Sequence, residues 1–297
     1  MRKITYLLQN DTSGMSGAEI AEKTGINRMT ITKYLDILST IGLINKKKVG
    51  SVNLWSLESG AIDLEFPANF TEVHQKFSNA VLQGNENQSK GILINMVNSN
   101  ADQVKLLTDV LLPTVNTINE LYNMGRLGKT ERISFLNSIS ELLDLLKFSV
   151  QTIGNKINAQ SIAVAGSEDR IYHGKCGAIA LQILGWSSSY IGSVEQHLDP
   201  FFDIDFQRYI AKVWNKRNGL MLICIHSSAE ASLRFLLAAA KPMKEKLRGR
   251  LEVILITSPE LEQLLRDVGA DFVTSDIQSM VKWAEQEFKK FPVSGYA

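Results

Sequence analysis

The chain has 297 residues, of which 44% are hydrophobic and 21% are charged, and its formal net charge at pH 7 is +1. This length allows two or three domains of ordinary size, and the composition is that of a soluble globular protein. The near-neutral charge excludes a general polycation, so any contact with nucleic acid has to come from a local basic patch.

Membrane, secretion and zinc signals are missing from the sequence. No apolar run reaches the roughly 18 residues that a membrane span requires, and Asn10 and Asp11 interrupt the first apolar stretch too early for a secretory signal. The two cysteines, Cys176 and Cys224, lie in apolar segments without a C-x-x-C spacing. We therefore expect a cytoplasmic protein with no membrane contact, no zinc site or disulfide, and two buried, inert thiols.

The first predicted elements are two short helices separated by a glycine. Ser16 can cap a helix, and Glu19, three residues later, can return the bond to its backbone. Gly25 interrupts the pattern, and Asn27 is a good cap for a second helix. The apolar residues of that helix recur at helical spacing: Ile31, Leu35, Leu38 and Ile41. This spacing is typical of a helix-turn-helix.

A hairpin follows the second helix. Gly42 ends the helix, an extended segment begins at Leu43, and residues 46–51 (KKKVGS) predict a hairpin turn before Val52. The whole pattern resembles the winged-helix domains of bacterial and archaeal repressors, in which the second helix enters the major groove and the hairpin, or wing, contacts the flanking backbone.

The residues expected to contact DNA are polar or basic. Four lie early in the second helix and off its apolar stripe: Arg28, Thr30, Thr32 and Lys33. Three lie in the wing and would contact phosphate: Lys46, Lys47 and Lys48. Only Asp36 opposes this local positive charge, so we predict that residues 1–60 bind double-stranded DNA. The alternative is a winged helix used for protein contacts, with the lysines as a solvated turn.

The middle of the chain reads as helical. Residues 58–69 are irregular and contain Gly60 and Pro67, as expected of a linker. Residues 70–157 show no strand signal, and their apolar residues recur at helical spacing in successive runs that begin near Val104, Val115 and Leu136. This pattern predicts a four-helix bundle.

Part of this bundle resembles a known module. Residues 106–135 (LLTDVLLPTVNTINELYNMGRLGKTERISF) are similar to the helical module beside the cobalamin domain of methionine synthase, corrinoid methyl-carrier proteins and light-responsive cobalamin-dependent repressors. The resemblance implies that the residues facing the upper side of the corrin ring are Tyr122, Gly125, Leu127, Glu131 and Arg132. Tyr122 replaces the tryptophan of the repressors and Arg132 replaces their histidine. The alternative interpretation of these residues is ordinary helix packing.

The last third of the chain alternates short apolar runs with helical segments. The runs are SIAVAG, SSSYIG, LMLICIH, LEVILITS and DFVTSD, and the helical segments include residues 205–218, 229–247 and 259–268. This alternation predicts an α/β domain with a parallel sheet covered by helices on both faces. Five strands fit a flavodoxin-like, and thus Rossmann-like, order, with ligands beyond the carboxyl ends of the strands.

The first loop of this domain does not match the common nucleotide loops. Gly166, Gly174 and Gly177 lack the spacing of a dinucleotide fingerprint, and the lysine after Gly174 is followed by cysteine rather than by the Ser or Thr of a phosphate loop. The loop instead resembles the cobalamin-domain signature D-x-H-x-x-G, with Asp169 and Gly174 at its spacing and Ile171 at the position of the metal-binding histidine.

The resemblance has further consequences for the edge of the sheet. His173 lies two residues past the ligand position, so we expect a hydrogen-bonded loop histidine; the alternative is that the loop is rebuilt and His173 becomes a ligand. The family has a serine after the third strand, where this chain has Ser227 and Ser228, and two glycines after the fourth. Thr257 and Ser258 replace these glycines, and we expect them to narrow the groove for the nucleotide tail.

The order of domains resembles that of the light-responsive cobalamin-dependent repressors: a winged helix (1–60), a four-helix bundle (70–157) and a flavodoxin-like domain (158–297). The resemblance runs from Phe77 to Phe291. It implies a transcription regulator, acting as a homodimer or higher homo-oligomer, whose C-terminal half senses a small molecule held between the bundle and the flavodoxin-like domain.

The identity of any cofactor is unknown at this point. The fold suggests cobalamin, but Ile171 and Arg132 replace both axial histidines. Two alternatives stay open: a corrinoid methyl-carrier protein, and a regulator whose sensory half binds no ligand and serves dimerisation or protein contacts. No nucleophile, base and orienting group occur at a recognisable spacing, so we expect no enzymatic activity.

Overall fold

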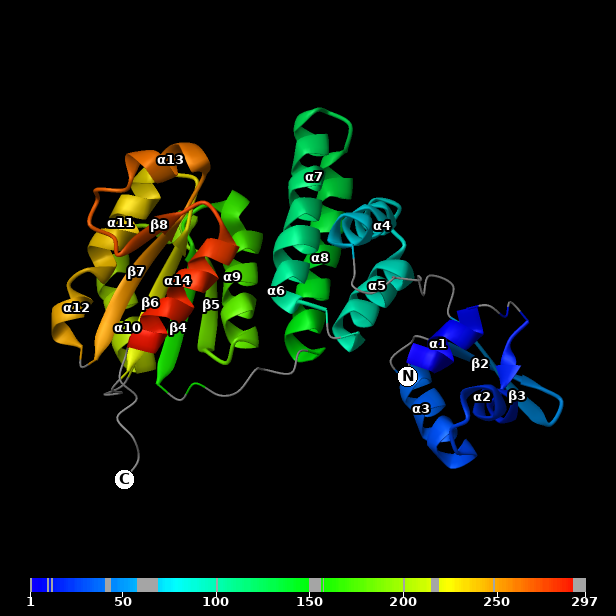
Figure 1. Ribbon diagram of the computed structural model, residues 1–297. Coiled ribbons are helices and arrows are strands. Elements are labelled where there is room, and N and C mark those ends of the chain that lie inside the picture. The colour runs from blue at the N-terminus through cyan, green and yellow to red at the C-terminus, as the bar shows by residue number, and fades with distance from the viewer. Residues whose placement is uncertain are drawn as a thin grey trace, which may run out of the picture. The chain divides into compact units, whose positions relative to one another are not determined.

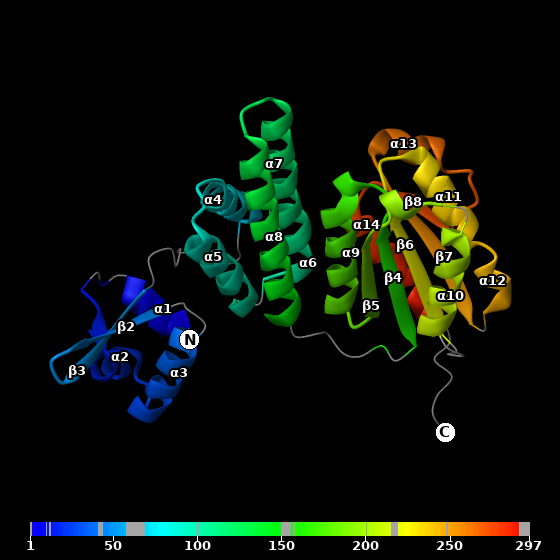
Figure 2. The same ribbon diagram turned by 180° about the vertical axis from the view of Figure 1, so that it is seen from behind.

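The computed structural model describes residues 2–9, 11, 13–40, 44–57, 69–99, 101–149, 156, 158–199, 201–214, 219–247 and 249–290 (Figures 1 and 2). The chain forms two compact units, one of Met1–Asp102 with Asp109–Ser149 and one of Gln103–Thr108 with Val150–Ala297. Within the described ranges, no helix is long and apolar enough to cross a membrane.

The N-terminal part is a winged helix with a three-stranded antiparallel sheet of order β1-β3-β2. Its elements are α1 (Arg2–Gln9), β1 (Met15–Ser16), α2 (Gly17–Thr24), α3 (Arg28–Thr40), β2 (Ile44–Val49) and β3 (Val52–Leu57). The side chains of Ile4, Ile20, Leu35 and Trp55 meet in its core. The sequence pattern did not predict α1 or β1, which supply Ile4 and Met15 to this core.

The capping residues position the helix-turn-helix as predicted. The Ser16 hydroxyl accepts a hydrogen bond from the Glu19 N–H at 3.3 Å, and the Glu19 carboxylate accepts one from the Ser16 N–H at 2.7 Å. Gly25 ends α2 with a φ of 69°, a left-handed conformation that favours glycine. Asn27 accepts a hydrogen bond from the Met29 N–H at 2.9 Å and so fixes the start of α3.

The wing differs from the expectation in its length. Residues 46–48 are not part of the turn: strand β2 continues to Val49, and the turn consists of Gly50 and Ser51. The strand continues because Lys46, Lys47 and Lys48 pair with Trp55, Leu54 and Asn53 of β3. The predicted helix end at Gly42 and most of the predicted linker at 58–69 fall outside the described residues.

Residues 70–149 form a helical region in which α4, α5, α7 and α8 make up the predicted bundle, while residues 103–108 belong to the other compact unit. The helical elements of this region are α4 (Phe70–Leu82), α5 (Glu86–Asn98), α6 (Gln103–Leu106), the π-helical turn η1 (Leu107–Leu111), α7 (Leu112–Asn123) and α8 (Lys129–Ser149). The π-helical turn ends two residues before Pro113, which has no N–H to donate to the carbonyl of Asp109. The hydroxyls of Ser78 on α4 and Thr114 on α7 form a buried hydrogen bond of 2.7 Å.

The C-terminal part is the predicted α/β domain with a parallel sheet. The strand order is β5-β4-β6-β7-β8, which is the flavodoxin-like order. The strands are β4 (Ala159–Ala165), β5 (Ser187–Ser193), β6 (Leu220–His226), β7 (Arg250–Ile256) and β8 (Phe272–Thr274). Strands β4 and β6 are buried along their whole length, as expected for strands with both faces covered.

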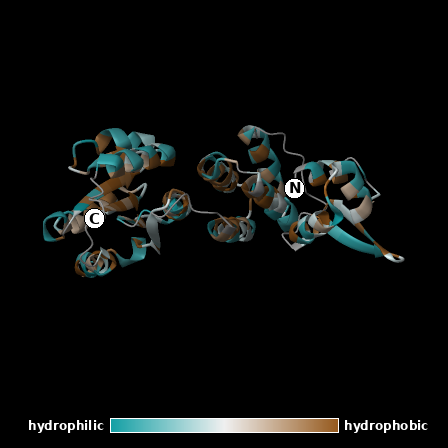
Figure 3. Ribbon diagram, turned by 60° about the horizontal axis from the view of Figure 1, so that its bottom comes forward, coloured by the Kyte–Doolittle hydropathy of each residue, from teal (hydrophilic) through white to brown (hydrophobic). Residues whose placement is uncertain are grey.

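Helices cover both faces of this sheet (Figures 1 and 2). The helices are α9 (Ile171–Ile183), α10 (Phe202–Trp214), α11 (Glu230–Ala240), α12 (Met243–Lys246), α13 (Pro259–Leu264) and α14 (Ile277–Lys290). Helices α9 and α14 contact each other, as do α10 and α11. Figure 3 shows hydrophobic and hydrophilic residues alternating along the helices, as expected when one side of each helix packs inward.

Three predicted helix bounds were wrong. Helix α10 begins at Phe202 because the Asp199 carboxylate accepts hydrogen bonds from the N–H groups of Phe201 and Phe202. The helix predicted at 229–247 breaks at Lys241 and Pro242 into α11 and α12. The helix predicted at 259–268 ends at Leu264.

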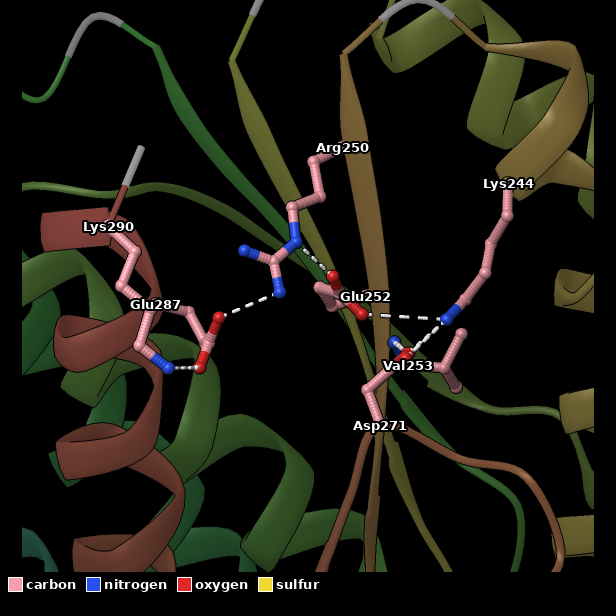
Figure 4. Close-up of polar contacts among 7 residues, drawn as sticks. All are labelled: Lys244, Arg250, Glu252, Val253, Asp271, Glu287 and Lys290. Carbon is pink, nitrogen blue, oxygen red and sulfur yellow. Dashed lines mark hydrogen bonds and ion pairs between the residues drawn. The ribbon is translucent and has the colours of Figure 1, made fainter. Parts of the chain in front are cut away.

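An ion-pair network lies at the amino end of β7 (Figure 4). The Arg250 guanidinium contacts the Glu252 carboxylate and lies 2.8 Å from the Glu287 carboxylate of α14. Lys290 Nζ is 2.7 Å from Glu287, and Lys244 of α12 pairs with Asp271, which precedes β8. The network therefore ties α12, α14 and the start of β8 to β7, at the edge of the sheet opposite to the carboxyl ends of the strands.

Candidate functional site

The first candidate site is the outer face of α3. Ile31, Leu35 and Leu38 are at most 1% exposed and hold the helix against the core. The predicted DNA-contacting residues lie off this stripe: Arg28, Thr32 and Lys33 are exposed and Thr30 is half-buried. The Thr32 hydroxyl donates to the Arg28 carbonyl at 3.0 Å, so part of its bonding capacity is used within the helix.

The wing adds a second set of cations. Lys46, Lys47 and Lys48 are exposed on β2, and successive side chains point to opposite faces of the strand. The Lys46 ammonium lies 5.0 Å from the centre of the Trp55 ring, which limits its freedom. The winged helix thus presents cations on α3 and on β2. Sequence reasoning missed Met29, which is 75% exposed in the first turn of α3; its place off the apolar stripe was the available signal.

The residues assigned to the upper side of the corrin ring make contacts within the bundle. The Arg132 guanidinium lies 4.9 Å from the centre of the Tyr122 ring, and its Nε donates to the Asn119 side chain at 2.9 Å. The Glu131 carboxylate accepts a hydrogen bond from the Gly128 N–H at 2.7 Å. These contacts are those of the helix-packing interpretation, and the assignment of the residues to a ligand stays a prediction.

The second candidate site is the carboxyl edge of the parallel sheet. The Ser228 N–H donates to the Ser167 hydroxyl at 3.0 Å, and the Ser228 hydroxyl donates to the Asp169 carboxylate at 2.7 Å. These bonds join the segments that follow β4 and β6. The direction of strand order reverses between these two strands, which is where ligands bind in open α/β sheets.

The segment after β4 differs from the predicted loop. Residues 168–170 form a short 3₁₀ helix and α9 begins at Ile171, so His173 and Gly174 are helical. The Tyr190 hydroxyl donates to the Ile171 carbonyl at 2.7 Å. A Cβ on Gly174 would lie 2.8 Å from Cε2 of Tyr190, so glycine is needed for the ring to pack there. The Tyr190 side chain therefore contacts the first turn of α9 at both Ile171 and Gly174.

The expectation of a hydrogen-bonded loop histidine at position 173 is wrong. His173 lies in the first turn of α9, and its Nδ1 is buried without a hydrogen-bond partner among the described residues. Burial, reinforced by the positive charge of Arg170, lowers the pKa of His173 to about 4. The ring is therefore neutral at pH 7.

His226 is the residue of this edge that sequence reasoning overlooked. It is the last residue of β6, it is fully buried, and neither ring nitrogen has a hydrogen-bond partner within the described part of the chain. Burial is the main reason that its pKa is lowered to about 3, and His173 and Arg170 lower it further. A Cβ on Gly177 would lie 2.9 Å from Cε1 and Nε2 of the ring. The available signal was a histidine that closes an apolar run.

The residues after β6 and β7 mostly form hydrogen bonds with neighbouring parts of the chain. The Ser227 hydroxyl accepts a hydrogen bond from the Ala229 N–H at 3.1 Å. Thr257 is fully buried, with its N–H bonded to the Thr274 carbonyl at 3.0 Å and its hydroxyl without a described partner. Ser258 caps α13, accepting from the Leu261 N–H at 3.5 Å. Cys176 and Cys224 are buried, which raises the pKa of both thiols.

Metal-ligating side chains do not gather anywhere in the described ranges: no three His, Cys, Asp or Glu side chains lie close enough to hold an ion together. His173 of α9 and His226 of β6 are instead two buried histidines whose lowered pKa values leave both rings neutral at pH 7. Arg170 lies near both, and its Nε is 3.4 Å from the Asp169 carboxylate.

Comparisons with known proteins agree with the N-terminal helix-turn-helix and with the fold of the rest of the chain. Residues 1–50 match a family model described as an HTH domain. No curated protein matches the chain. The monomethylamine corrinoid protein of Methanosarcina barkeri is similar in structure, with a TM-score of 0.56 and 13% identity over 73% of this chain and 98% of that one.

A cobalamin-binding protein from Desulfitobacterium hafniense DCB-2 also matches, with a TM-score of 0.36 and 16% identity over 71% of this chain and 97% of that one. At 13% identity, the likeness to the Methanosarcina barkeri protein shows the fold alone. The chain combines an N-terminal helix-turn-helix domain with a helical region and a five-stranded parallel sheet of the cobalamin-binding, Rossmann-like fold.

Proposed function

We propose that this chain is a DNA-binding transcription regulator whose C-terminal half receives the signal that controls DNA binding. The observation that carries the proposal is the pair of cationic surfaces on the winged helix. Arg28 and Lys33 are exposed on α3, and Lys46–Lys48 are exposed on β2, while the apolar stripe of α3 is buried against the core. Such a helix suits the major groove, and such a wing suits phosphate.

The proposal includes a homodimer that binds an inverted or direct repeat with half-sites about one helical turn apart. A signal that acts on the C-terminal half can change DNA affinity only if it binds the DNA-competent and the DNA-incompetent arrangements with different affinities. Because the C-terminal half has the cobalamin-binding, Rossmann-like fold, we assign the chain to regulators that respond to a ligand.

Cobalamin held as the resemblance implies does not fit the carboxyl edge of the sheet. Ile171 has no lone pair to offer cobalt, and it lies in a helical turn that the Tyr190 hydroxyl holds in place. His226 fills the space beside Gly177, and Tyr190 fills that beside Gly174. Thr257, at a glycine position of the family, is fully buried. We therefore infer that a signal other than histidine-ligated cobalamin acts on this half.

Two other functions compete with this one. The likeness to the corrinoid protein of Methanosarcina barkeri favours a methyl-carrier protein, but such a carrier would need a ligand at Ile171 and would have no use for the winged helix. The other is a regulator whose C-terminal half binds no ligand and serves dimerisation or protein contacts. The side chains of Ser227, Ser258 and Tyr190 form hydrogen bonds within the chain, which supports a C-terminal half that binds no ligand.

The test is the salt dependence of binding to duplex DNA, measured by fluorescence anisotropy. The triple variant K46A/K47A/K48A should bind all duplexes more weakly and lose up to about 3 units of the salt slope, because each phosphate contact contributes about 0.9. The variant R28A/K33A should lose about tenfold or more on a selected duplex and less on random DNA.

A matched control removes three exposed cations from the C-terminal half, as R208A/K212A/K282A. This control should keep the DNA affinity and salt slope of the wild type. Equal salt slopes for the wild type and the wing variant would refute DNA binding through this surface.

A further inference from the structure

Met29 is an exposed apolar residue on the outer face of α3. Its side chain is 75% exposed, whereas Ile31 and Leu35 on the opposite face are at most 1% exposed. The hydrogen bond from the Met29 N–H to the Asn27 side chain, 2.9 Å long, fixes this residue in the first turn of the helix. Met29 thus contributes little to the core and is available for contacts of the outer face.

The surroundings of Met29 are cationic. Arg28 precedes it, and Lys33 lies four residues later, one turn along the same side of the helix. Both side chains are exposed. The acidic residue of α3, Asp36, lies two turns further on. An apolar side chain between two cations suits a polyanion with apolar groups in its grooves better than it suits an apolar protein surface.

We propose that Met29 contacts the C5 methyl group of a thymine in the major groove and thereby sets the base preference at one position of each half-site. The proposal rests on the proposed DNA-binding function. The first residues of a recognition helix are those that reach base edges, and thymine is the base that presents a methyl group there. A thioether has no hydrogen-bond donor and is only a weak acceptor, so its contribution is an apolar contact.

The experiment starts from duplexes that the full-length protein selects from a random pool. Each thymine of the selected sequence is then replaced, one at a time, by 2′-deoxyuridine, which lacks only the methyl group. At one thymine per half-site, the substitution should weaken binding by the wild type about fourfold, the factor that burial of one methylene-sized group corresponds to.

Variants assign this preference to Met29. M29A should bind the thymine and uracil duplexes equally, while M29L should keep the discrimination because leucine also makes an apolar contact. The matched control is I37A, because Ile37 is 45% exposed on the same helix but two turns further on. I37A should discriminate as the wild type does. The midpoint of thermal unfolding of M29A should not change, since the side chain is outside the core.

The possible results separate the two proposals. If the protein enriches no duplex, the sequence-specific DNA binding of the proposed regulator is refuted, and the Met29 contact with it. If it enriches a duplex but the wild type does not distinguish thymine from uracil at any position, or if M29A distinguishes them as well as the wild type does, only the Met29 contact is refuted.

Discussion

His226 and Gly177 fit one another in size where α9 packs on the sheet: the imidazole at the end of β6 occupies the space in which a Cβ of residue 177 would lie, 2.9 Å from Cε1 and Nε2. The G177A variant should therefore be destabilised by about 1–3 kcal/mol through overpacking. In an H226A background the same substitution should become neutral or stabilising by up to about 1 kcal/mol, because alanine favours a helix over glycine.

Urea unfolding of the four proteins in this cycle measures the coupling between the two sites. G174A serves as the matched control, since a Cβ there would clash with Tyr190 instead, at 2.8 Å. H226A should not rescue G174A. A cost for G177A that is the same with and without His226 would show that the imidazole does not occupy this space.

The buried histidines should make the C-terminal half sensitive to acid. Burial lowers the pKa of His173 to about 4 and that of His226 to about 3, from the ordinary value of 6.5. The folded state thus favours the neutral rings, and the unfolded state binds more protons below pH 6.5. Their contribution to stability is complete above about pH 6.5 and declines as the pH falls towards 4 and then 3.

Each histidine should add a slope of about 1.4 kcal/mol per pH unit to the free energy of unfolding across its range. The check is urea unfolding between pH 4 and 7 for the wild type, H173Q and H226Q. Each variant should have a shallower slope than the wild type by about that amount. Parallel curves for H226Q and the wild type would show that His226 is protonated equally in both states.

The order of helices and strands could be predicted from the sequence, whereas the contacts at the carboxyl ends of the strands could not. Strand β6 is a continuous apolar run and α2 carries its own capping box, so both could be predicted from local patterns. The first turn of α9 contacts Tyr190, which is 19 residues from Ile171 along the chain, and the His226 ring packs against Gly177. Contacts at such sequence separations leave no periodic signal.

The ion-pair network at β7 should contribute to stability through its buried carboxylates. The side chains of Glu252 and Glu287 are 8% and 6% exposed, and Arg250 lies between them (Figure 4). R250A would remove the cation that bridges the two carboxylates and would leave Glu252 paired with Lys244 and Glu287 paired with Lys290, so we expect a loss of about 3 kcal/mol. R266A removes an exposed partner of Glu262, 3.8 Å away, and should lose less than about 1 kcal/mol. Chemical unfolding of the two variants compares them, and equal losses would contradict a stabilising role for the network.

The fold suggests a cobalamin site, whereas the residues at the axial positions do not support one. The wild type should not retain adenosylcobalamin or hydroxocobalamin in a histidine-ligated form through gel filtration, because Ile171 offers no donor and α9 already begins at that residue. I171H supplies an imidazole at the family's position and is the variant in which such binding should appear.

H173A tests the alternative in which the other histidine of α9 takes the role of the ligand. For His173 to reach cobalt, the first turn of α9 would have to unwind and the Tyr190 bond to the Ile171 carbonyl would have to break. Absorption spectra taken in the dark distinguish the cases. Tight binding by the wild type, with a histidine-ligated spectrum that disappears in H173A, would overturn the prediction. A spectrum gained only in I171H would support it, since the two proteins differ only in the donor at position 171.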